Sequence, residues 1–552
     1  MSITSRLKKS RNNWKNQAKD RGKQVRYKNA QLKRVKQERA EYKSKLKDVT
    51  QKLEEEREKR QKEQKEILPV KKEILIFISL RLFLTGHIGF RAISRVLGIL
   101  QSFLGIIKPP CPQTIINWVI RYSLAKIWNY NPVPSICLAN NKFVNGAIWI
   151  IDTSIALGSG KILAVLELKI DHYNNHDGAP ALEDVNCVAV SVAESWTGKS
   201  IANFLKEVIG ITGKPAAFLK DGGLDLMKAV RLLNEEGFSS FSIDDISHVI
   251  ANLLKHEYSK HPSYDIFLST CGQASKKLKQ TVLAFLAPPK ISTKARFMNI
   301  HRLIEWAEMV LQHSPAGRVS DDSPIAKLRI ALGSLPECKG FIERFLRDAK
   351  PLLQCQEILK RNGLHWDTYQ VCKELLKNIP ENSRVRIGFV LWMEKQLITS
   401  ELLGTGKIGL PISSDILEAL FGLIKTHAAP ILKDANRIAL RLPALCGKLT
   451  ESAAQKVMDI SVKQQQEIEK KLMSLIKLRR AILPNPGSLT ENFSTENYSN
   501  LSLTPVPKSE QNKDNIIEIT EGYEKLNVPE KKGGKQCKSI NDTFDEYYAE
   551  AI

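Results

Sequence analysis

The sequence predicts an α/β protein, with a mixed sheet and flanking helices, a large all-α insertion and a helical, basic N-terminal region. Short apolar runs of β type, separated by turns, fill residues 146–257. Apolar residues at helical spacing follow from residue 260 to about 410. Residues 1–66 hold 23 Lys and Arg against 10 Asp and Glu, a net charge of +13. The change from one pattern to the next predicts separate structural modules along the chain.

Length and charge narrow the class of protein. A chain of 552 residues, 43% of them hydrophobic, can bury a substantial core in several modules. Its formal charge of +24 predicts a polyanionic partner, most commonly nucleic acid, with a ribosomal or membrane surface as the alternative. The nine cysteines are scattered, without zinc-ligand spacing, which predicts reduced thiols in a cytoplasmic protein. The apolar run 74–84 is interrupted by Arg81 and is too short for a membrane span, and no secretory signal is expected.

Residues 1–70 form the basic N-terminal arm. A thin apolar stripe at helical spacing runs along it, comprising Leu32, Val35, Tyr42, Leu46, Val49 and Leu53. This stripe is compatible with a short coiled coil. A single solvated helix or a disordered basic arm remains the alternative, and either form could lie along DNA phosphates.

Residues 71–130 have the spacing of two or three packed helices and predict a helix-turn-helix-like DNA-binding region. Pro112 begins the last of these helices, with Thr114 as an expected cap. The alternative is a small bundle whose polar face only confers solubility. The residues expected to face DNA are Arg91, Arg95, Gln113, Thr114, Asn117 and Arg121.

Residues 145–260 predict the first part of the α/β core. The expected strands are 147–157, 161–170, 186–196, 215–221 and 238–244, and the expected helices are 199–209, 224–234 and 247–258. Gly158, Ser159 and Gly160 predict a hairpin turn between the first two strands. Three sequential strands followed by helix, strand, helix and strand predict a mixed sheet, which is also the order of a ribonuclease-H-like fold.

The remainder of the chain is expected to be mainly helical. Residues 261–410 predict the all-α insertion, residues 411–450 a return to the core, and residues 451–483 a C-terminal helix. Residues 484–552 are rich in Ser, Asn, Thr, Lys and Glu, so we expect a disordered tail.

Two aspartates stand out in the predicted strands, one within the first strand and one at the end of the fourth. Asp152 interrupts the apolar segment 146–157, where an unpaired carboxylate would cost several kcal/mol, so it either caps the following turn or binds metal. Asp221 ends the fourth strand, and Gly222 and Gly223 turn the chain away. The carboxyl edge of an α/β sheet is where sites form, and the first and fourth strands are adjacent in the predicted order. Their pairing favours the metal interpretation of Asp152.

A later helix contains the third carboxylate. Glu418 lies in the segment SSDILEALFGLIKTH, and Lys425 follows two helical turns later on the same face. Asp415 is the local alternative to Glu418. A surface lysine without a functional role is the alternative for Lys425.

The ordered segments IIDTS, FLKDGG, DDISHVIANLLK and SSDILEALFGLIK resemble the DDE-class transposases of bacterial insertion sequences. The resemblance extends from Leu75 to about Leu449 and implies that Asp152, Asp221 and Glu418 are the catalytic metal ligands. It implies two Mg²⁺ or Mn²⁺ ions, with Lys425 contacting a DNA phosphate. The family also has a tyrosine and an arginine ahead of the glutamate, where this chain has Pro411 and Ser414, which indicates a different subgroup.

The function that the resemblance implies is DNA transposition: binding of terminal inverted repeats, followed by metal-dependent cleavage and strand transfer. The implied partners are double-stranded DNA, as element ends and target, and a second copy of the chain in a homodimer on paired ends, with no membrane partner. The alternatives are a ribonuclease-H-like DNA nuclease and a catalytically inactive DNA-binding protein descended from a transposase.

Two further pairs of residues lie outside the three carboxylates. Asp245 is expected to cap a helix that carries His248, and both are secondary candidates for orienting water or terminal DNA. His172 and His176 would be four apart on a helix, but Gly178 and Pro180 favour a loop, so we expect no metal role for them.

Overall fold

The computed structural model describes residues 3–63, 70–137, 143–154, 156–158, 160–292, 296–313, 317–427, 434–472 and 499–507. The chain divides into two compact units. One comprises residues 1–75 and 94–111, and the other comprises residues 76–93 and 112–552. No described helix has the length and apolar character that crossing a membrane requires.

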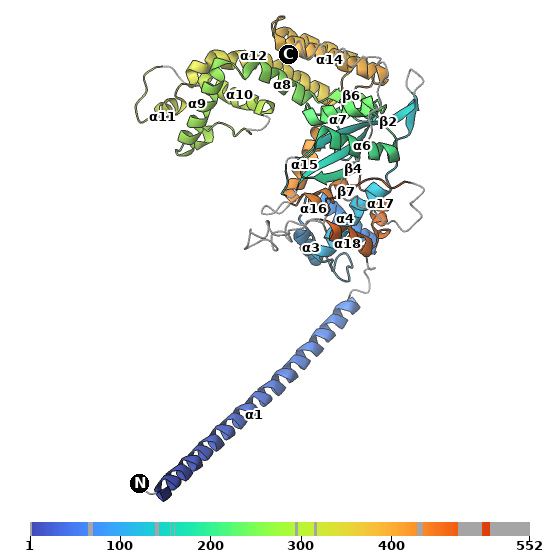
Figure 1. Ribbon diagram of the computed structural model, residues 1–552. Coiled ribbons are helices and arrows are strands. Elements are labelled where there is room, and N and C mark those ends of the chain that lie inside the picture. The colour runs from blue at the N-terminus through green and yellow to red at the C-terminus, as the bar shows by residue number, and fades with distance from the viewer. Residues whose placement is uncertain are drawn as a thin grey trace. The chain divides into compact units, whose positions relative to one another are not determined.

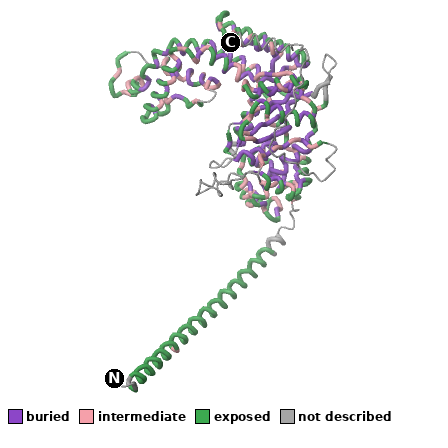
Figure 2. The backbone as a smooth tube through the Cα atoms, in the orientation of Figure 1, coloured by how far each residue is buried: buried purple, intermediate pink, exposed green. Residues whose placement is uncertain are grey.

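The smaller unit contains a long helix, α1 (Ile3–Glu63). Figure 2 colours its residues as exposed along almost the whole length. The apolar stripe is exposed too, from 52% for Leu53 to 71% for Leu46, so the helix has no buried face of its own. A continuous helix replaces the disordered alternative for these residues. Pairing into a coiled coil needs a second chain and stays a prediction.

The larger unit is built on a mixed sheet (Figure 1). Its described strands are β1 (Ser135–Cys137), β2 (Phe143–Thr153), β3 (Lys161–Lys169), β4 (Val185–Ala193), β5 (Pro215–Lys220), β6 (Phe241–Asp244) and β7 (Ser502–Leu503). The order is β6-β5-β2-β3-β4-β7, with β1 pairing to β2. β2, β5 and β6 are parallel neighbours, while β2, β3, β4 and β7 pair antiparallel. The expected mixed sheet is therefore confirmed, and its order is consistent with a ribonuclease-H-like core.

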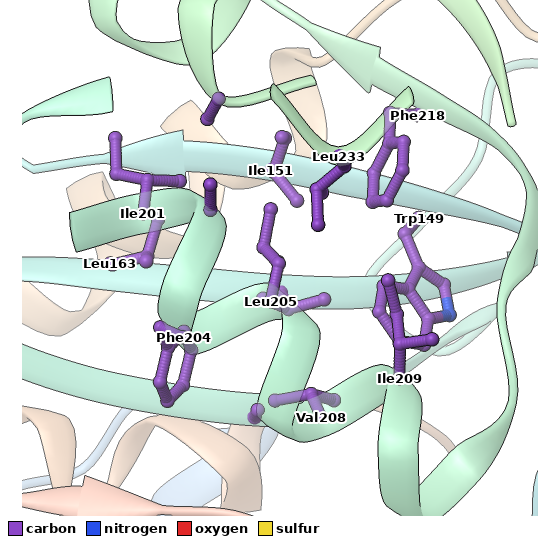
Figure 3. Close-up of a cluster of buried hydrophobic side chains, with 14 of the residues drawn as sticks. Trp149, Ile151, Leu163, Ile201, Phe204, Leu205, Val208, Ile209, Phe218 and Leu233 are labelled. Carbon is purple, nitrogen blue, oxygen red and sulfur yellow. The ribbon is translucent and has the colours of Figure 1, made fainter. Parts of the chain in front are cut away.

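Two helices, α6 (Gly198–Thr212) and α7 (Leu224–Glu235), cover one face of this sheet. Figure 3 shows Leu205 and Val208 of α6 packed with Trp149 and Ile151 of β2. Side chains alternate between the two faces of a strand, so Trp149 and Ile151 lie on the covered face. Asp152 therefore lies on the opposite face, where α15 (Asp415–His427) contacts β2.

The other described helices divide into three groups along the chain. Those before the sheet and in the β3–β4 connection are α2 (Lys72–Leu84), α3 (Phe90–Ile99), α4 (Pro112–Trp128) and α5 (His172–Asn175). Those after β6 and through the insertion are α8 (Ile246–Tyr258), α9 (Pro262–Lys279), α10 (Ile300–His313), α11 (Pro324–Leu332), α12 (Lys339–Asn362), α13 (Trp366–Leu375) and α14 (Arg384–Leu402). After α15 come α16 (Ala435–Ala439), α17 (Glu451–Gln455) and α18 (Val462–Lys471).

The C-terminal region differs from the expectation. The predicted helix 451–483 is divided into α17 and α18, and residues 473–498 lie outside the described residues. The prediction of disorder is wrong for residues 499–507, because β7 pairs with β4 and Leu501 and Leu503 are 1% and 2% exposed. These two leucines complete the edge of the sheet next to β4. The rest of the predicted tail lies outside the described residues.

Three local expectations also need correction or delimitation. Thr114 is not a cap, because α4 already begins at Pro112. The expected loop at His172 contains the helical turn α5. Ser159 of the predicted hairpin turn lies outside the described residues. The cysteines whose side chains are described are free thiols, as expected.

Candidate active site

Asp152 and Asp221 lie at the carboxyl edge of two adjacent parallel strands. In the register of β2 and β5, Ile151 pairs with Lys220, and the two aspartates are the next residues along the chain. β6 continues this row, because Lys220 pairs with Asp244 and Asp245 follows. Parallel strands end at a common edge, so three carboxylates lie at the ends of three neighbouring strands there.

The environment of Asp152 disfavours its charged form. Burial, and then the neighbouring Asp221 carboxylate, raise the pKa of Asp152 to about 7 from an ordinary value of 3.8. The N–H of Thr153 donates to Asp152 Oδ1 at 2.6 Å, which partly offsets this effect. The turn-capping interpretation therefore accounts for only one oxygen of Asp152. The electrostatic coupling to Asp221 shows that the carboxylate also belongs to a cluster of charged groups.

Asp221 is held by the tight turn after β5. Its Oδ1 accepts a hydrogen bond from the N–H of Gly223 at 2.8 Å. A Cβ at Gly223 would lie 2.8 Å from that oxygen, so a larger residue here would displace the Asp221 carboxylate. A Cβ at Gly222 would lie 3.2 Å from Asn252 Nδ2 of α8, so this glycine lets α8 approach the site.

Asp245 joins two helices that lie far apart in the sequence. As the N-cap of α8, it accepts a hydrogen bond from the His248 N–H at 2.9 Å, which confirms the predicted cap. Its other oxygen accepts from the N–H and the hydroxyl of Ser414, at 2.6 and 3.0 Å. The N–H of Ile246 also donates to the carbonyl of Ile412 at 3.0 Å. Asp245 is 1% exposed, so these bonds fix the start of α15 against the sheet edge.

Glu418 lies in the first turn of α15 and pairs with His248 of α8. Its Oε1 is 3.8 Å from His248 Nε2, and the glutamate side chain is 57% exposed. Although burial disfavours the charged ring, Glu418, Asp245 and Asp221 raise the pKa of His248 to about 9. Glu418 and His248 also act on Asp152. Two strands and two helices therefore bring these groups into one electrostatic cluster.

Asp415, the alternative to Glu418, makes structural contacts. It forms an ion pair with Lys360 at the end of α12, and its Oδ1 accepts a hydrogen bond from the Ser247 hydroxyl at 3.4 Å. Gln356, also on α12, donates to the same hydroxyl at 2.7 Å. Asp415 thus fastens α15 to the insertion. Lys425 belongs to α15, but its side chain lies outside the described residues.

The donor set fits a divalent cation of the magnesium class. Carboxylate oxygens are the ligands that Mg²⁺ and Mn²⁺ prefer. Burial, and then the negative charge of Asp221, raise the pKa of Asp152, and a bound cation would offset both effects. Without a metal cation, the protonated ring of His248 offsets part of the negative charge of these carboxylates.

The candidate DNA-binding residues fall into different environments. Arg91 and Arg95 of α3 and Gln113 of α4 are exposed, whereas Thr114 and Asn117 are partly buried. Asn117 accepts hydrogen bonds from Gln113 at 2.9 Å and from Gln465 at 3.0 Å. Arg121 was expected on the same exposed face, and that expectation is wrong. It is 8% exposed and donates to the carbonyl of Ile460 at 3.2 Å.

Sequence reasoning missed two residues that organise the site and a third that lies beside it. Ser414 was noted only as a departure from a family pattern, yet it bonds Asp245. Lys360 has no local signal, because its partner Asp415 is 55 residues away. Asn252 is four residues after His248 on the same helix, and that spacing, which places it beside His248, could have identified it.

Comparisons with known proteins add a structural similarity. No protein-family model matches the chain, and no curated protein matches its sequence. Among solved structures, the chain is similar to one in a Drosophila P element transposase strand transfer complex. The TM-score is 0.35 at 11% sequence identity, over 68% of this chain and 92% of the other. At this level of similarity, function is inferred from the chain's own residues.

Proposed function

We propose that this chain is a DNA transposase of the DDE class with a ribonuclease-H-like core. It binds terminal inverted repeats and performs metal-dependent DNA cleavage and strand transfer. The observation that carries the proposal is the gathering of Asp152, Asp221 and Glu418 at one sheet edge. The sequence resemblance names the same three residues independently of their proximity in space.

In this function, Asp152 and Asp221 hold divalent cations from the two strands, and Glu418 holds them from α15. Bound Mg²⁺ or Mn²⁺ would activate a water or 3′-hydroxyl and stabilise the leaving oxygen of an in-line displacement. His248 neutralises Glu418 before a cation arrives, because its pKa is about 9. Asp245 keeps α15 at the edge of the sheet through Ser414.

The basic segments supply the affinity for DNA. α1 carries most of the positive charge of residues 1–66, and its exposed side chains are free to lie along phosphates. Arg91 and Arg95 add exposed cations on α3. A dimer on paired ends, with α1 of two copies forming a coiled coil, is part of the proposal.

The test is a DNA cleavage and joining assay with the purified full chain, Mg²⁺ and a plasmid that carries both flanks of its coding region. Wild-type protein should nick the flanks and join the released ends to target DNA. Asp152→Asn should abolish both products. Asp265→Asn is the matched control, because it removes the same charge from an exposed position on α9.

The outcomes separate the alternatives. Hydrolysed ends without joined product would indicate a nuclease. Tight DNA binding without Mg²⁺-dependent cleavage by the wild type would indicate an inactive DNA-binding protein. Equal activity of Asp152→Asn and wild type would reject the site assignment.

A further inference from the structure

A second group of ligands lies in the connection between β3 and β4, where a loop without metal function was expected. His172 begins the helical turn α5 and His176 is its C-cap. Their rings are stacked, with centroids 5.0 Å apart and an interplanar angle of 5°. The four-residue spacing thus brings two imidazoles to one side of the turn.

A carboxylate from the end of the same connection completes the group. Asp184 Oδ1 lies 3.6 Å from His176 Nε2, while its Oδ2 accepts from the Ala181 N–H at 2.9 Å. This second bond fixes the carboxylate and leaves Oδ1 facing the histidines. Ligand atoms of His172, His176 and Asp184 all lie within 4.8 Å of one another.

An independent observation points to a ligand. His172 is only 3% exposed, and its Nε2 is buried without a hydrogen-bond partner. The ring is hydrogen-bonded to the backbone of Gly178, and with Nε2 unpartnered this bond falls to Nδ1. A histidine that donates from Nδ1 presents the lone pair of Nε2, as metal-bound histidines commonly do. Burial also lowers the pKa of His172, which favours the neutral ring.

We propose that His172, His176 and Asp184 bind a transition-metal cation of the zinc class. Two imidazole nitrogens and one carboxylate oxygen are ligands that Zn²⁺ accepts, with the fourth position left to water. Bonds of about 2.0 to 2.2 Å place tetrahedral ligands about 3.3 Å apart, so small side-chain rotations close the group around an ion. His176 has a side chain that is 46% exposed and provides the entry side. This site is separate from the three carboxylates of the proposed transposase and does not rest on that function.

The bound ion would stabilise a junction between the sheet and the insertion. Tyr173, between the two histidines, donates its hydroxyl hydrogen to the carbonyl of Lys360 at 2.9 Å. Its ring lies against Gly363, where a Cβ would come within 2.7 Å. Lys360 in turn pairs with Asp415 at the start of α15. Fastening α5 therefore supports the contact that α12 makes with α15.

The experiment measures Zn²⁺ binding to the full chain after chelator treatment, by competition with a chromophoric chelator. Asp152→Asn serves as the background, so that the carboxylate site contributes little. We expect one Zn²⁺ per chain and a rise of the Tm when Zn²⁺ is added. His176→Gln and Asp184→Asn should weaken binding about tenfold or more and remove the Tm shift. Co²⁺ should give the absorption of a four-coordinate nitrogen and oxygen site.

The matched control is His256→Gln, which replaces an exposed histidine near the end of α8 and should bind Zn²⁺ normally. Because His176 is exposed, its replacement leaves the fold intact, which circular dichroism checks. The proposal is overturned if no stoichiometric Zn²⁺ binds. It is equally overturned if His176→Gln and Asp184→Asn bind Zn²⁺ as tightly as the background protein.

Discussion

The carboxylate of Asp245 accepts two hydrogen bonds from Ser414, a residue 169 positions later in the chain. Asp245 begins α8, which carries His248, and Ser414 directly precedes α15, which carries Glu418. One buried carboxylate thus brings the two helices to the same edge of the sheet. The arrangement explains how a glutamate beyond a long helical insertion reaches two aspartates on β2 and β5.

Removing the Asp245–Ser414 link should impair the site, although neither residue is proposed as a metal ligand. Asp245→Asn places an amide where Ser414 needs an acceptor, so we expect about 10- to 100-fold slower DNA cleavage and weaker Mn²⁺ binding. Unfolding free energy should fall by about 1 to 3 kcal/mol, as measured by denaturant titration. Ser414→Ala removes only the hydroxyl bond and should have a smaller effect on all three. Full activity of Asp245→Asn would show that α15 is held by other contacts.

Asp152 should destabilise the metal-free fold at high pH. Its folded pKa of about 7 exceeds the ordinary 3.8, so folding favours the protonated acid. The resulting stability is complete below pH 3.8 and is lost as pH rises through about 7. In chelator at pH 8, the free energy of unfolding of Asp152→Asn should therefore be about 1 to 3 kcal/mol higher than that of wild type. The difference should shrink towards pH 4, and a difference independent of pH would contradict the raised pKa.

His248 becomes charged on protonation, whereas Asp152 becomes neutral, and His248 titrates over a higher pH range. Its pKa rises from 6.5 to about 9, so its contribution to stability is present below 6.5 and is lost as pH rises through 9. NMR of the ring protons in chelator should give a midpoint near 9. Glu418→Gln should lower that midpoint, and so should addition of Mg²⁺, because both remove negative charge facing the ring. An unchanged midpoint in Glu418→Gln would separate His248 from the glutamate.

Replacing Arg95 should affect DNA binding, whereas replacing Arg121 should affect stability. Arg95→Gln should weaken DNA binding and reduce the slope of log affinity against log salt by about 0.9, because an exposed arginine releases counterions. Arg121→Gln should leave the slope unchanged and lower the unfolding free energy by about 1 to 3 kcal/mol, because the Ile460 carbonyl loses its donor. A reduced slope in Arg121→Gln would place that residue on the DNA surface after all.

The sheet strands could be predicted because their signal is local. Apolar, β-branched runs bounded by turns predicted β2 to β6, and the helices between them were confirmed to within a few residues. β7 was missed, because Ser502 and Leu503 are a short pair in a polar tail and pair with a distant strand. Arg121 contradicts the expectation because a polar residue on a helix predicts an exposed position, whereas most of α4 from Ile115 onwards is buried.

The candidate site was predictable only in part, because local sequence patterns do not reveal long-range contacts. Strand ends identified Asp152 and Asp221, and the β2–β5 pairing brings these two residues together. Glu418 was found by resemblance, since its approach depends on the long-range Asp245–Ser414 bonds, for which no local pattern exists. Gly178 and Pro180 predict a loop around His172 and His176, yet one helical turn precedes these two helix-breaking residues.

The most direct test of the central claim is Mn²⁺ binding to the wild-type chain, measured by EPR of free Mn²⁺ at pH 8. Asp152, Asp221 and Glu418 are expected to be the ligands, so Asp152→Asn, Asp221→Asn and Glu418→Gln should each weaken binding about tenfold or more. Asp415→Asn should bind Mn²⁺ as the wild type does, because Asp415 pairs with Lys360. Wild-type Mn²⁺ affinity in Asp152→Asn would contradict the assignment of this sheet edge as a metal site.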